Sequence, residues 1–515
     1  MFNYEPMMNI EVYSHFFKVR HPTYKCRQVI WEFVKRWITY HMAVVGRGKR
    51  QLVPNKIFAG KLADNSEYRF HIGQYQEFIK FMNDNYISDN LYTVTVMPIP
   101  DTTPIDVELL PNWTLIDYQE AIRSFIVDDS LMNRSRLVPL QTGKGKTVTS
   151  LSAIPSLGTR TAIVILPAYI EKWCSDITSI LNVDPKEIMV IQGGKTLKGL
   201  IDVAGDGELT AKFIVISIST LKKFYKAYET NPYSLEEEGY SCGPDQFFEH
   251  IGVGTVIIDE VHQHLHAIYK MLTYTHVNRV IALSATFIAR DTVLKKVQSA
   301  MFPPETRFDS VEFDRYIKVT AVGYSFVSCD PRQLNLTERG SNYYSHNAFE
   351  KSILRMNSVG LKYMNLVNEL IHGGFLSTYQ PGDKLMIFAS SINMCTFMVN
   401  WLKIKYPQFD VRRYVEDDPY EDVIEPDIRV STILSSGTAI DIPQLTCTIM
   451  TVSIDSPISN LQALGRLRKI PGRDVKFYYI YCDQIDKHVA YHRNKVALFR
   501  PKTESIKEFK FPVGV

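Results

Sequence analysis

The feature that most constrains the fold is a repeated alternation between short apolar runs and longer stretches with helical periodicity. Between residues 113 and 310 the apolar runs are TAIVILP (161–167), EIMVIQG (187–193), FIVIS (213–217), TVIIDE (255–260) and RVIALSAT (279–286). Runs rich in β-branched residues that are apolar on both faces are typical of parallel strands buried between two layers of helices. The alternation therefore predicts an α/β domain with a parallel sheet.

The same alternation returns in the second half of the chain. The runs there are KLMIFAS (384–390), IRVSTIL (428–434), CTIMTVS (447–453) and VKFYYIY (475–481). We therefore expect two tandem α/β lobes, 113–310 and 311–515. Residues 1–112 mix short strand-like and helix-like runs and end in the proline-rich segment 97–112, which is typical of a linker. They predict a small α+β domain ahead of the two lobes.

Composition narrows the class of protein. The chain has 515 residues, enough for about three domains. Its net charge of only +3 gives no global attraction to nucleic acid, so local charge must supply any such attraction. The seven cysteines form no CxxC pair, which argues against zinc ribbons and a disulfide framework and favours a reduced, intracellular protein. Neither a secretory leader nor an apolar run of membrane-spanning length is visible, so we expect no membrane association.

A candidate phosphate-binding loop lies near the start of the first lobe. The segment RLVPLQTGKGKTVTSLSAI (136–154) has an apolar run, a glycine- and lysine-rich loop and a helical run, in the order that such a loop requires. It contains the short form TGKGKT, although Leu140 departs from the longer GxxxxGK[ST] pattern. A surface turn is the alternative. The expected phosphate-binding residues are Thr142, Gly143, Lys144, Gly145, Lys146 and Thr147.

The chemistry of phosphate binding suggests a role for each part of this loop. Gly143 and Gly145 would let backbone N–H groups approach phosphate oxygens, beside the N-terminus of the following helix. Lys146 would reach the β- and γ-phosphates, and Thr147 would ligate Mg²⁺.

Two adjacent carboxylates end one of the predicted strands. Asp259 and Glu260 close the run TVIIDE, and ligands of open α/β sheets collect at such strand ends. Asp259 could hold Mg²⁺ through water, and Glu260 could act as general base toward the attacking water. A lone Asp-Glu pair could equally be a strand-end turn. Combined with the loop in the same lobe, it predicts a site for a nucleoside triphosphate and Mg²⁺.

Four segments in order resemble the motifs of superfamily 2 helicases of the DExH type. QTGKGKT (141–147), DEVH (259–262), LSAT (283–286) and QALGRLRK (462–469) resemble motifs I, II, III and VI. The resemblance covers about residues 113–490 and implies two RecA-like lobes that hydrolyse ATP. It also implies that Tyr118 stacks on adenine and that Gln119 reads the edge of the base. The alternative is that both are ordinary helix-face residues.

The resemblance implies further residues for nucleic-acid contact and for coupling. LPAYIEKW (166–173), ISTL (218–221) and the segment 428–445 resemble motifs Ia, Ib and V, the last with Ala439 where relatives usually have glycine. The residues implied are Pro167, Thr220, His262, Ser284, Thr286, Thr438 and Asp441. His264 and His266 suggest a metal site at first sight, but no set of cysteines or carboxylates accompanies them, so we disfavour it.

The last motif departs from the usual spacing. The resemblance implies that Gln462 contacts the γ-phosphate or the attacking water and that an arginine stabilises the transition state. Relatives commonly have QxxGRxxR, whereas here Arg466 and Arg468 are two residues apart and Lys469 stands at the usual position of the second arginine. We favour Arg468 for this role, with Arg466 almost as essential. Lys469 is the alternative.

Basic and aromatic residues are interleaved near the N-terminus. Residues 17–50 hold nine Lys or Arg and one acidic residue, among Phe16, Phe17, Tyr24, Trp31 and Phe33. This pattern fits a face that follows a phosphate backbone, with Arg47, Lys49 and Arg50 on an exposed turn. It fits equally a solvated surface above an aromatic core. The layout of a small domain ahead of these motifs is similar to that of T4-type phage recombination helicases, which remodel branched DNA.

We expect an ATP-dependent DNA helicase or translocase that acts on duplex or branched DNA, in the cytoplasm of a bacterium or of a phage-infected host. One alternative is an RNA helicase or transcript-release ATPase, and another is the motor subunit of a restriction or defence complex. A binding module without ATPase activity is disfavoured because Lys146, Asp259, Glu260 and Arg466 are all present. The N-terminal region could also dock a protein partner, and nothing in the sequence indicates an oligomeric state.

Overall fold

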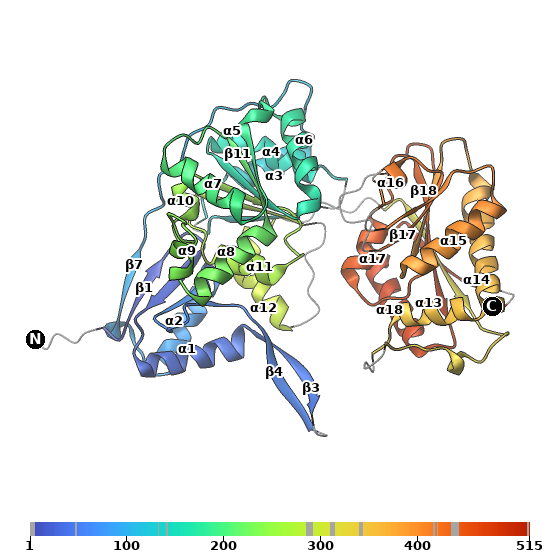
Figure 1. Cartoon of the computed structure of the whole chain (residues 1–515), viewed down its shortest axis with the longest axis horizontal. Coiled ribbons are helices and arrows are strands. Elements are labelled where there is room, and N and C mark those ends of the chain that lie inside the picture. Colours follow the sequence, from blue (N-terminus) through green and yellow to red (C-terminus); the bar gives the residue numbers. More distant parts are fainter. Residues whose placement is uncertain are drawn as a thin grey trace, which may run out of the picture. The chain divides into compact units, whose positions relative to one another are not determined.

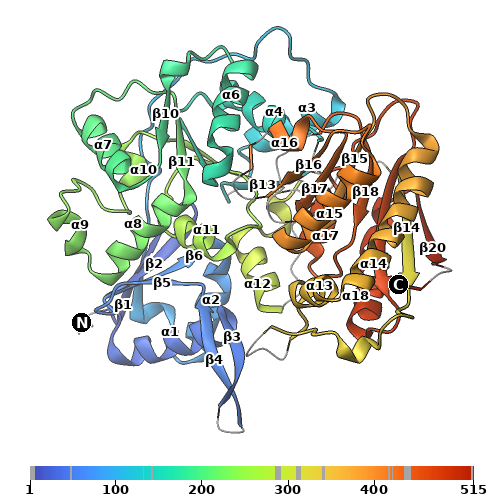
Figure 2. The same cartoon turned by 45° about the vertical axis from the view of Figure 1, so that its right-hand side comes forward.

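The chain divides into two compact units, Met1–Val311 and Glu312–Val515. The structure is a computed structural model, shown in Figures 1 and 2. It describes residues 6–46, 49–131, 133–140, 143–284, 292–308, 315–338, 343–415, 418–419, 421–433, 442–511 and 514–515, with the backbone alone for 42–46 and 49–52.

The N-terminal region is a small α+β fold, as the sequence predicted. Its sheet has the order β5 (Gly60–Lys61), β6 (Glu67–His71), β2 (Phe16–Arg20), β1 (Met8–Val12) and β7 (Tyr92–Val96). Helices α1 (Tyr24–Trp37) and α2 (Tyr75–Asp84) pack on one face of this sheet. The rings of Phe33 on α1 and Phe78 on α2 contact Phe70 at centroid distances of 5.8 and 5.2 Å. The aromatic residues thus form the core of this region.

A β-hairpin projects from the N-terminal region (Figure 1). It consists of β3 (Thr39–Gly46) and β4 (Lys49–Ile57), which pair antiparallel and form a sheet of their own. Gly46 pairs with Lys49, so the connection between the strands has two residues, both outside the described ones.

The first α/β unit is a parallel sheet of six strands. Their order is β10 (Ile188–Ile191), β11 (Phe213–Ser217), β9 (Thr161–Ile165), β12 (Thr255–Ile258), β13 (Arg279–Ser284) and β8 (Ser135–Pro139). All five expected strands are confirmed, and β8 is the apolar run ahead of the glycine-rich loop. The sheet is buried on both faces because alternate residues such as Ile163 and Val164 enter two different core clusters.

Helices cover both faces of this sheet (Figure 2). One face carries α3 (Asp117–Val127), α4 (Lys146–Ser152), α5 (Ile154–Leu157) and α6 (Ile170–Ile180). The other carries α7 (Gly194–Gly205), α8 (Ile218–Thr230), α9 (Tyr233–Glu237), α10 (Phe247–His250), α11 (Leu265–Leu272) and α12 (Thr292–Met301). The N-terminal region shares its apolar core with this second set, so it is packed into the unit.

The proline-rich segment after β7 also lies against the first α/β sheet. Backbone N–H groups of Thr103, Ile105 and Leu110 donate to the carbonyls of Gly252, Gly158 and Ile180 at 2.9–3.0 Å. Prolines suit such an extended path because they restrict the backbone and lack a donor. The segment therefore runs along the surface of the sheet domain and is hydrogen-bonded to it.

The second unit is a parallel sheet of seven strands. Their order is β16 (Val411–Tyr414), β17 (Ile428–Thr432), β15 (Lys384–Ala389), β18 (Leu445–Met450), β19 (Val475–Cys482), β14 (Ile317–Tyr324) and β20 (Ser505–Lys510). One core contains α13 (His346–Arg355), α14 (Asn357–Leu370) and α15 (Ile392–Lys405), and the other contains α16 (Glu421–Ile424), α17 (Pro457–Leu464) and the end of α18 (Asp486–Phe499). The four expected strands are confirmed, and the α/β fold class with two parallel-sheet lobes is as predicted. No helix of the described residues is both long and apolar enough to cross a membrane.

Candidate active site

The glycine-rich loop connects β8 to α4. Gly143 and Gly145 have φ values of 84° and 77°, a region that glycine adopts without the steric cost of a side chain. A Cβ at Gly145 would lie 2.5 Å from Nε2 of Gln119, so no larger residue fits unless that side chain moves. The positive φ of the backbone and the nearby side chain of Gln119 together favour glycine at position 145. Thr142, which the sequence also assigned to this loop, lies outside the described residues.

Lys146 is the first residue of α4, and its ammonium meets a carboxylate from a distant part of the chain. Its Nζ lies 2.6 Å from Oε1 of Glu260, which follows the end of β12. The two side chains are only 11% and 8% exposed. Strands β8 and β12 are parallel and are separated by β13 alone, so their carboxyl ends meet at one edge of the sheet. The structure thus brings the predicted lysine and general base together.

Asp259 is held by two hydrogen bonds. Its Oδ2 accepts a hydrogen bond from the indole Nε1 of Trp173 at 2.9 Å, and its Oδ1 accepts one from the backbone N–H of Glu260 at 2.9 Å. Burial raises the pKa of Asp259 above its usual range, and the Lys146 ammonium opposes this effect. Trp173 was not among the predicted ATP-site residues. The sequence placed its segment only with nucleic-acid contacts, and no local pattern indicates its contact with Asp259.

Glu260 and His262 connect the carboxylate pair to the end of β13. Nδ1 of His262 lies 3.2 Å from Oε2 of Glu260 and 2.8 Å from Oγ of Ser284. Burial, followed by the charge of Lys146, lowers the pKa of His262 to about 4. His262 is therefore neutral at pH 7. The predicted coupling residues His262 and Ser284 are in contact with each other and with the site.

Tyr118 and Gln119 come to the same loop from α3. The hydroxyl of Tyr118 donates to the backbone carbonyl of Lys144 at 3.0 Å. The side-chain oxygen of Gln119 accepts a hydrogen bond from the backbone N–H of Ile116 at 3.2 Å, and its amide nitrogen faces Gly145. Both residues predicted to recognise adenine therefore lie beside the phosphate loop.

The donor set fits a magnesium–nucleotide complex. Oε2 of Glu260 is buried and accepts no hydrogen bond from the described residues, and Asp259 lies next to it. Within the described part of the chain, no three His, Cys, Asp or Glu side chains gather closely enough to hold a metal ion. Mg²⁺ is usually bound through one or two carboxylates together with substrate phosphates and water, which is the kind of site that Asp259 and Thr147 offer.

The predicted nucleic-acid residues of the first sheet lie after β9 and β11. Pro167 is exposed in the turn after β9, and Thr220 is buried on α8. Oγ1 of Thr220 accepts a hydrogen bond from the backbone N–H of Gly193 at 2.8 Å and so holds the loop after β10. A cavity of about 460 Å³ lies at this loop, and its lining includes Gln192 and Lys223, which sequence reasoning missed. Thr286 lies outside the described residues.

Motif VI lies on and after α17 of the second unit. Gln462 is half-buried, Arg466 is only 3% exposed, and Lys469 is exposed. The guanidinium of Arg468 donates to the carbonyl of Gly465, which turns it back toward its own helix end. Thr438 and Asp441 lie outside the described residues.

Strands β15, β17 and β18 of the second unit end at a cavity of about 570 Å³ that the sequence did not reveal. Its polar lining residues are Asn347, Lys351, Ser390, Ser391, Asn393, Thr432, Ser456 and Ser459. Ser391 and Ser456 cap the N-termini of α15 and α17 by accepting hydrogen bonds from the N–H groups of Met394 and Ser459. The sequence signal that could have indicated this cavity is the serine at each cap, because serine is favoured where a helix begins.

Two of the basic residues near the N-terminus, Lys18 and Arg20, form ion pairs within the first unit. Nζ of Lys18 is buried 3.1 Å from Oδ2 of Asp245, and Arg20 pairs with Glu67 at 3.1 Å. Phe16, Phe17 and Phe33 are buried. The burial of these three rings agrees with the alternative interpretation of the pattern, in which the aromatic residues form a core. Arg47 lies outside the described residues, and Lys49 and Arg50 begin β4, of which only the backbone is described there.

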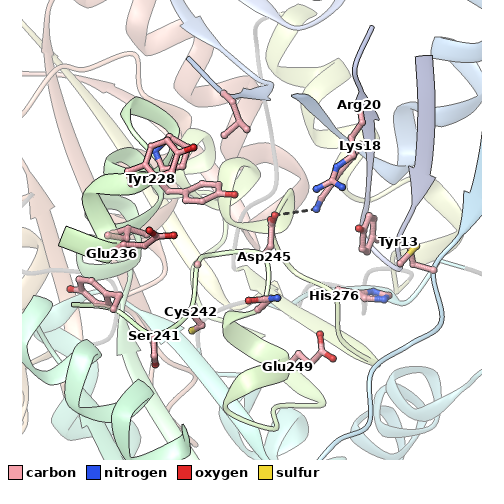
Figure 3. A pocket seen from close by; sticks show the side chains of 18 of the residues that line it. Tyr13, Lys18, Arg20, Tyr228, Glu236, Ser241, Cys242, Asp245, Glu249 and His276 are labelled. Atoms are coloured by element: carbon pink, nitrogen blue, oxygen red, sulfur yellow. Dashed lines mark hydrogen bonds and ion pairs between the residues drawn. The ribbon is translucent and has the colours of Figure 1, made fainter. Parts of the chain in front are cut away.

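A larger cavity, of about 1250 Å³, lies between the N-terminal region and the first sheet domain (Figure 3). Its lining has five carboxylates, Asp64, Asp101, Glu236, Asp245 and Glu249, and two cationic side chains, Lys18 and Arg20. Both cations already form ion pairs with carboxylates. An excess of negative charge repels a triphosphate, so the nucleotide site remains at the phosphate loop.

One family of known proteins matches the first sheet domain. Residues 112–289 match the family described as "Type III restriction enzyme, res subunit". This segment contains the loop, the carboxylate pair and all six strands of the first sheet. Residues 112–289 therefore resemble this family, and the match covers the segment in which the motifs predicted the first lobe of a superfamily 2 helicase. No curated protein matches the sequence significantly.

Among solved structures, the chain is similar to helicases at low sequence identity. The helicase domain of Pyrococcus furiosus Hef is 15% identical, with 73% of this chain and 97% of that chain covered and a TM-score of 0.43. Saccharomyces cerevisiae Dbp5 bound to RNA and ADP BeF3 is 12% identical, with 76% and 89% covered and a TM-score of 0.48. T4 UvsW is 12% identical, with 98% and 99% covered and a TM-score of 0.34.

Proposed function

We propose that this chain is an ATP-driven motor that moves along or unwinds DNA and hydrolyses ATP at Lys146, Asp259 and Glu260. The observation that carries the proposal is the buried contact between Lys146 and Glu260 beside a loop with two glycines in the left-handed region. A cation at the start of a helix and two carboxylates at the end of a neighbouring strand are what phosphoryl transfer needs for positioning and charge stabilisation.

Each residue of the site has a role in this proposal. Lys146 exchanges the Glu260 carboxylate for oxygens of the β- and γ-phosphates. Glu260 is then free to accept a proton from the attacking water, and Asp259 and Thr147 hold the magnesium ion that accompanies ATP. Tyr118 stacks on the adenine and Gln119 reads its edge, with Gly143, Lys144 and Gly145 around the phosphates.

The second unit would sense the γ-phosphate through motif VI. We assign Gln462 to the phosphate or the water, Arg468 to transition-state charge and Arg466 to a supporting role. The burial of Arg466 favours support of the motif, because a buried guanidinium has little freedom to move toward a ligand. The half-buried Arg468 is better placed to exchange its present carbonyl partner for a phosphate oxygen.

DNA is the nucleic acid that we favour. The layout similar to T4-type recombination helicases and the basic sequence GRGKR (46–50), with Arg47, Lys49 and Arg50, support this choice. Pro167, Thr220, Thr286, Thr438 and Asp441 are the backbone contacts that the motifs imply. A second candidate is the motor subunit of a restriction complex, because the matching family is described in those terms. A partner would then supply the nuclease.

The test is ATP hydrolysis by the full chain in the presence of single-stranded, forked and duplex DNA and of RNA, with Glu260→Gln as the background. We expect stimulation by DNA, strongest with forked or duplex substrate, and none in the variant. Stimulation by RNA alone would contradict the assignment to DNA. Equal turnover with and without every nucleic acid would contradict the motor itself.

A further inference from the structure

The backbone just after the catalytic carboxylates adopts a conformation that its surroundings must hold in place. Glu260 and His264 have φ values of 48° and 51°, in the left-handed region, which is unfavourable for residues other than glycine. Such conformations persist where the structure holds the segment at both ends. The first end is held by the Lys146 ion pair and by the hydrogen bond from the N–H of Val261 to the carbonyl of Leu283, 3.0 Å long.

The other end of this segment leads directly into α11, which is anchored on the N-terminal region. Nε2 of His266 lies 2.7 Å from the backbone carbonyl of Ile57, and it must donate because a carbonyl can only accept. The imidazole stands edge-on to the ring of Phe58, with centroids 5.2 Å apart at 83°. Tyr269, one turn further along α11, stands edge-on to the same ring at 5.6 Å and donates its hydroxyl to Gln74.

These contacts meet the base of the projecting hairpin. Ile57 is the last residue of β4, and the N–H of Phe58 donates to the carbonyl of Ile38, just before β3, at 2.9 Å. The hairpin therefore rests on α11 at its base, and β3 and β4 extend away from that base (Figures 1 and 2). Only five residues of chain lie between Glu260 and His266, so a displacement of the hairpin acts on the segment that carries the general base.

We infer that His266 is a positioning residue that couples the hairpin to the ATPase site. Nucleic acid bound at the hairpin displaces its base, and the His266–Ile57 hydrogen bond transmits this displacement to α11 and to the backbone of Glu260. The inference rests on the proposed function, because it concerns stimulation of ATP hydrolysis by nucleic acid. It also gives His266 a role other than metal binding, since its ring donates a hydrogen bond to the carbonyl of Ile57 at the base of the hairpin.

The experiment compares the full-length wild type with His266→Ala and His266→Gln. A glutamine amide reaches about as far as Nε2 and can donate to the same carbonyl. His250→Ala is the matched control: its half-buried ring also approaches a backbone carbonyl, that of Ile201 at 2.8 Å, but far from the hairpin. We measure kcat and KM for ATP with and without forked DNA, and a thermal melt of each variant.

We expect His266→Ala to lower DNA-stimulated kcat about two- to tenfold, the range that follows from removing one hydrogen bond, with little change in KM. His266→Gln should restore most of the stimulation, and His250→Ala should leave it unchanged. Full stimulation in a folded His266→Ala protein would overturn the inference. Equal losses in His266→Ala and His250→Ala would also overturn it, since they would indicate general destabilisation. Absence of stimulation in the wild type would instead reject the proposed function.

A shortened hairpin tests the path itself. Met42 and Val53 are paired, so replacing residues 43–52 with Asn-Gly keeps the base of the hairpin and removes its outer part. The shortened protein should lose the stimulation of ATP hydrolysis by forked DNA. Combined with His266→Ala, it should show no further loss, because both changes interrupt one path. Independent effects that multiply in the double variant would overturn the coupling through His266.

Discussion

Lys146 Nζ lies 2.6 Å from Glu260 Oε1 although the two residues are 114 positions apart in the sequence, and water reaches little of either side chain. Each group is the counter-ion of the other in the absence of nucleotide. A phosphate that replaces Glu260 on Lys146 leaves the carboxylate without its ion-pair partner and so available to accept a proton from water.

The first prediction concerns this pair. Glu260→Gln should reduce nucleic-acid-stimulated ATP hydrolysis about 10²–10⁴-fold, the usual contribution of a general base. Lys146→Ala should abolish hydrolysis and weaken ATP binding. Steady-state kinetics and ATP titration measure the two effects, with thermal melts to verify folding. Lys172→Ala is the control, because Lys172 forms an exposed pair with Asp176 in the same domain. Near-normal turnover of either folded site variant would reject the assigned roles.

The second prediction separates the cationic residues of motif VI. Arg468→Ala should lose hydrolysis by about 10³-fold or more while retaining ATP affinity, since such an arginine acts mainly on transition-state charge. Lys469→Ala serves as the neighbouring control and should be far milder, because Lys469 is exposed. Single-turnover hydrolysis and ATP binding distinguish the two steps. If the losses were reversed, Lys469 would be the residue that meets the γ-phosphate.

The third prediction concerns the turn of the hairpin. Reversing the charges of Arg47, Lys49 and Arg50 to Glu should weaken DNA binding and lower the log–log salt slope by about 0.9 for each DNA phosphate that the turn no longer neutralises. Among the described residues, β3 and β4 form a two-stranded sheet of their own, so the rest of the fold should persist. Binding is titrated against salt, with Lys403 and Lys405 of α15 reversed as an exposed control. An unchanged affinity and salt slope would mean that Arg47, Lys49 and Arg50 do not contact DNA.

The fourth prediction concerns an ion pair that joins the N-terminal region to the first sheet domain. Asp245 accepts hydrogen bonds from the fully buried Arg69 and from the buried Lys18. Asp245→Asn should lower the free energy of unfolding by about 3–5 kcal/mol, because it leaves a buried cation uncompensated. Denaturant unfolding measures this loss. Asp176→Asn, in an exposed pair, should cost about 1 kcal/mol or less. Similar losses in both would contradict a structural role for Asp245.

The pH dependence of this variant follows from the same contacts. Burial alone would raise the pKa of Asp245, but the charges of Arg69 and Lys18 outweigh it and hold the pKa well below its usual range. A carboxyl with a lowered folded pKa stabilises the protein above its unfolded pKa, near 4. The difference between wild type and Asp245→Asn should therefore stay constant from about pH 5 to 8 and shrink only in stronger acid.

The fifth prediction concerns Lys495 in the second unit. This lysine is 2% exposed, contacts the carbonyl of Val452 at 3.4 Å, and burial lowers its pKa to about 7. The unfolded state binds more protons between about pH 7 and 10, so Lys495 costs stability at and below pH 7 and this cost fades as pH rises. Lys495→Met should raise the unfolding free energy most at or below pH 7, and the gain should vanish toward pH 10. A gain in unfolding free energy that does not change with pH would contradict the lowered pKa of Lys495.

Much of the fold and of the ATP site could be predicted from local patterns. The strand at 255–258 and the loop around Gly143 and Gly145 each carry their signal within a few residues, in periodicity or in backbone requirement. Their meeting also follows from the rule that parallel strands end at one edge. The hairpin of β3 and β4 was not foreseen, because its first residues continue the helical pattern of α1, which ends at Trp37.

By itself, the sequence determined the α/β alternation, the order of the motifs and the residues Lys146, Asp259 and Glu260, since each depends on near neighbours along the chain. Tertiary structure alone decided which charges are buried. Lys18 resembles any other member of a basic cluster until folding places Asp245, 227 residues away, against it. The contacts of Trp173 with Asp259 and of His266 with Ile57 arise in the same way. Burial and partnership depend on which distant surfaces meet, and no local pattern of residues encodes that.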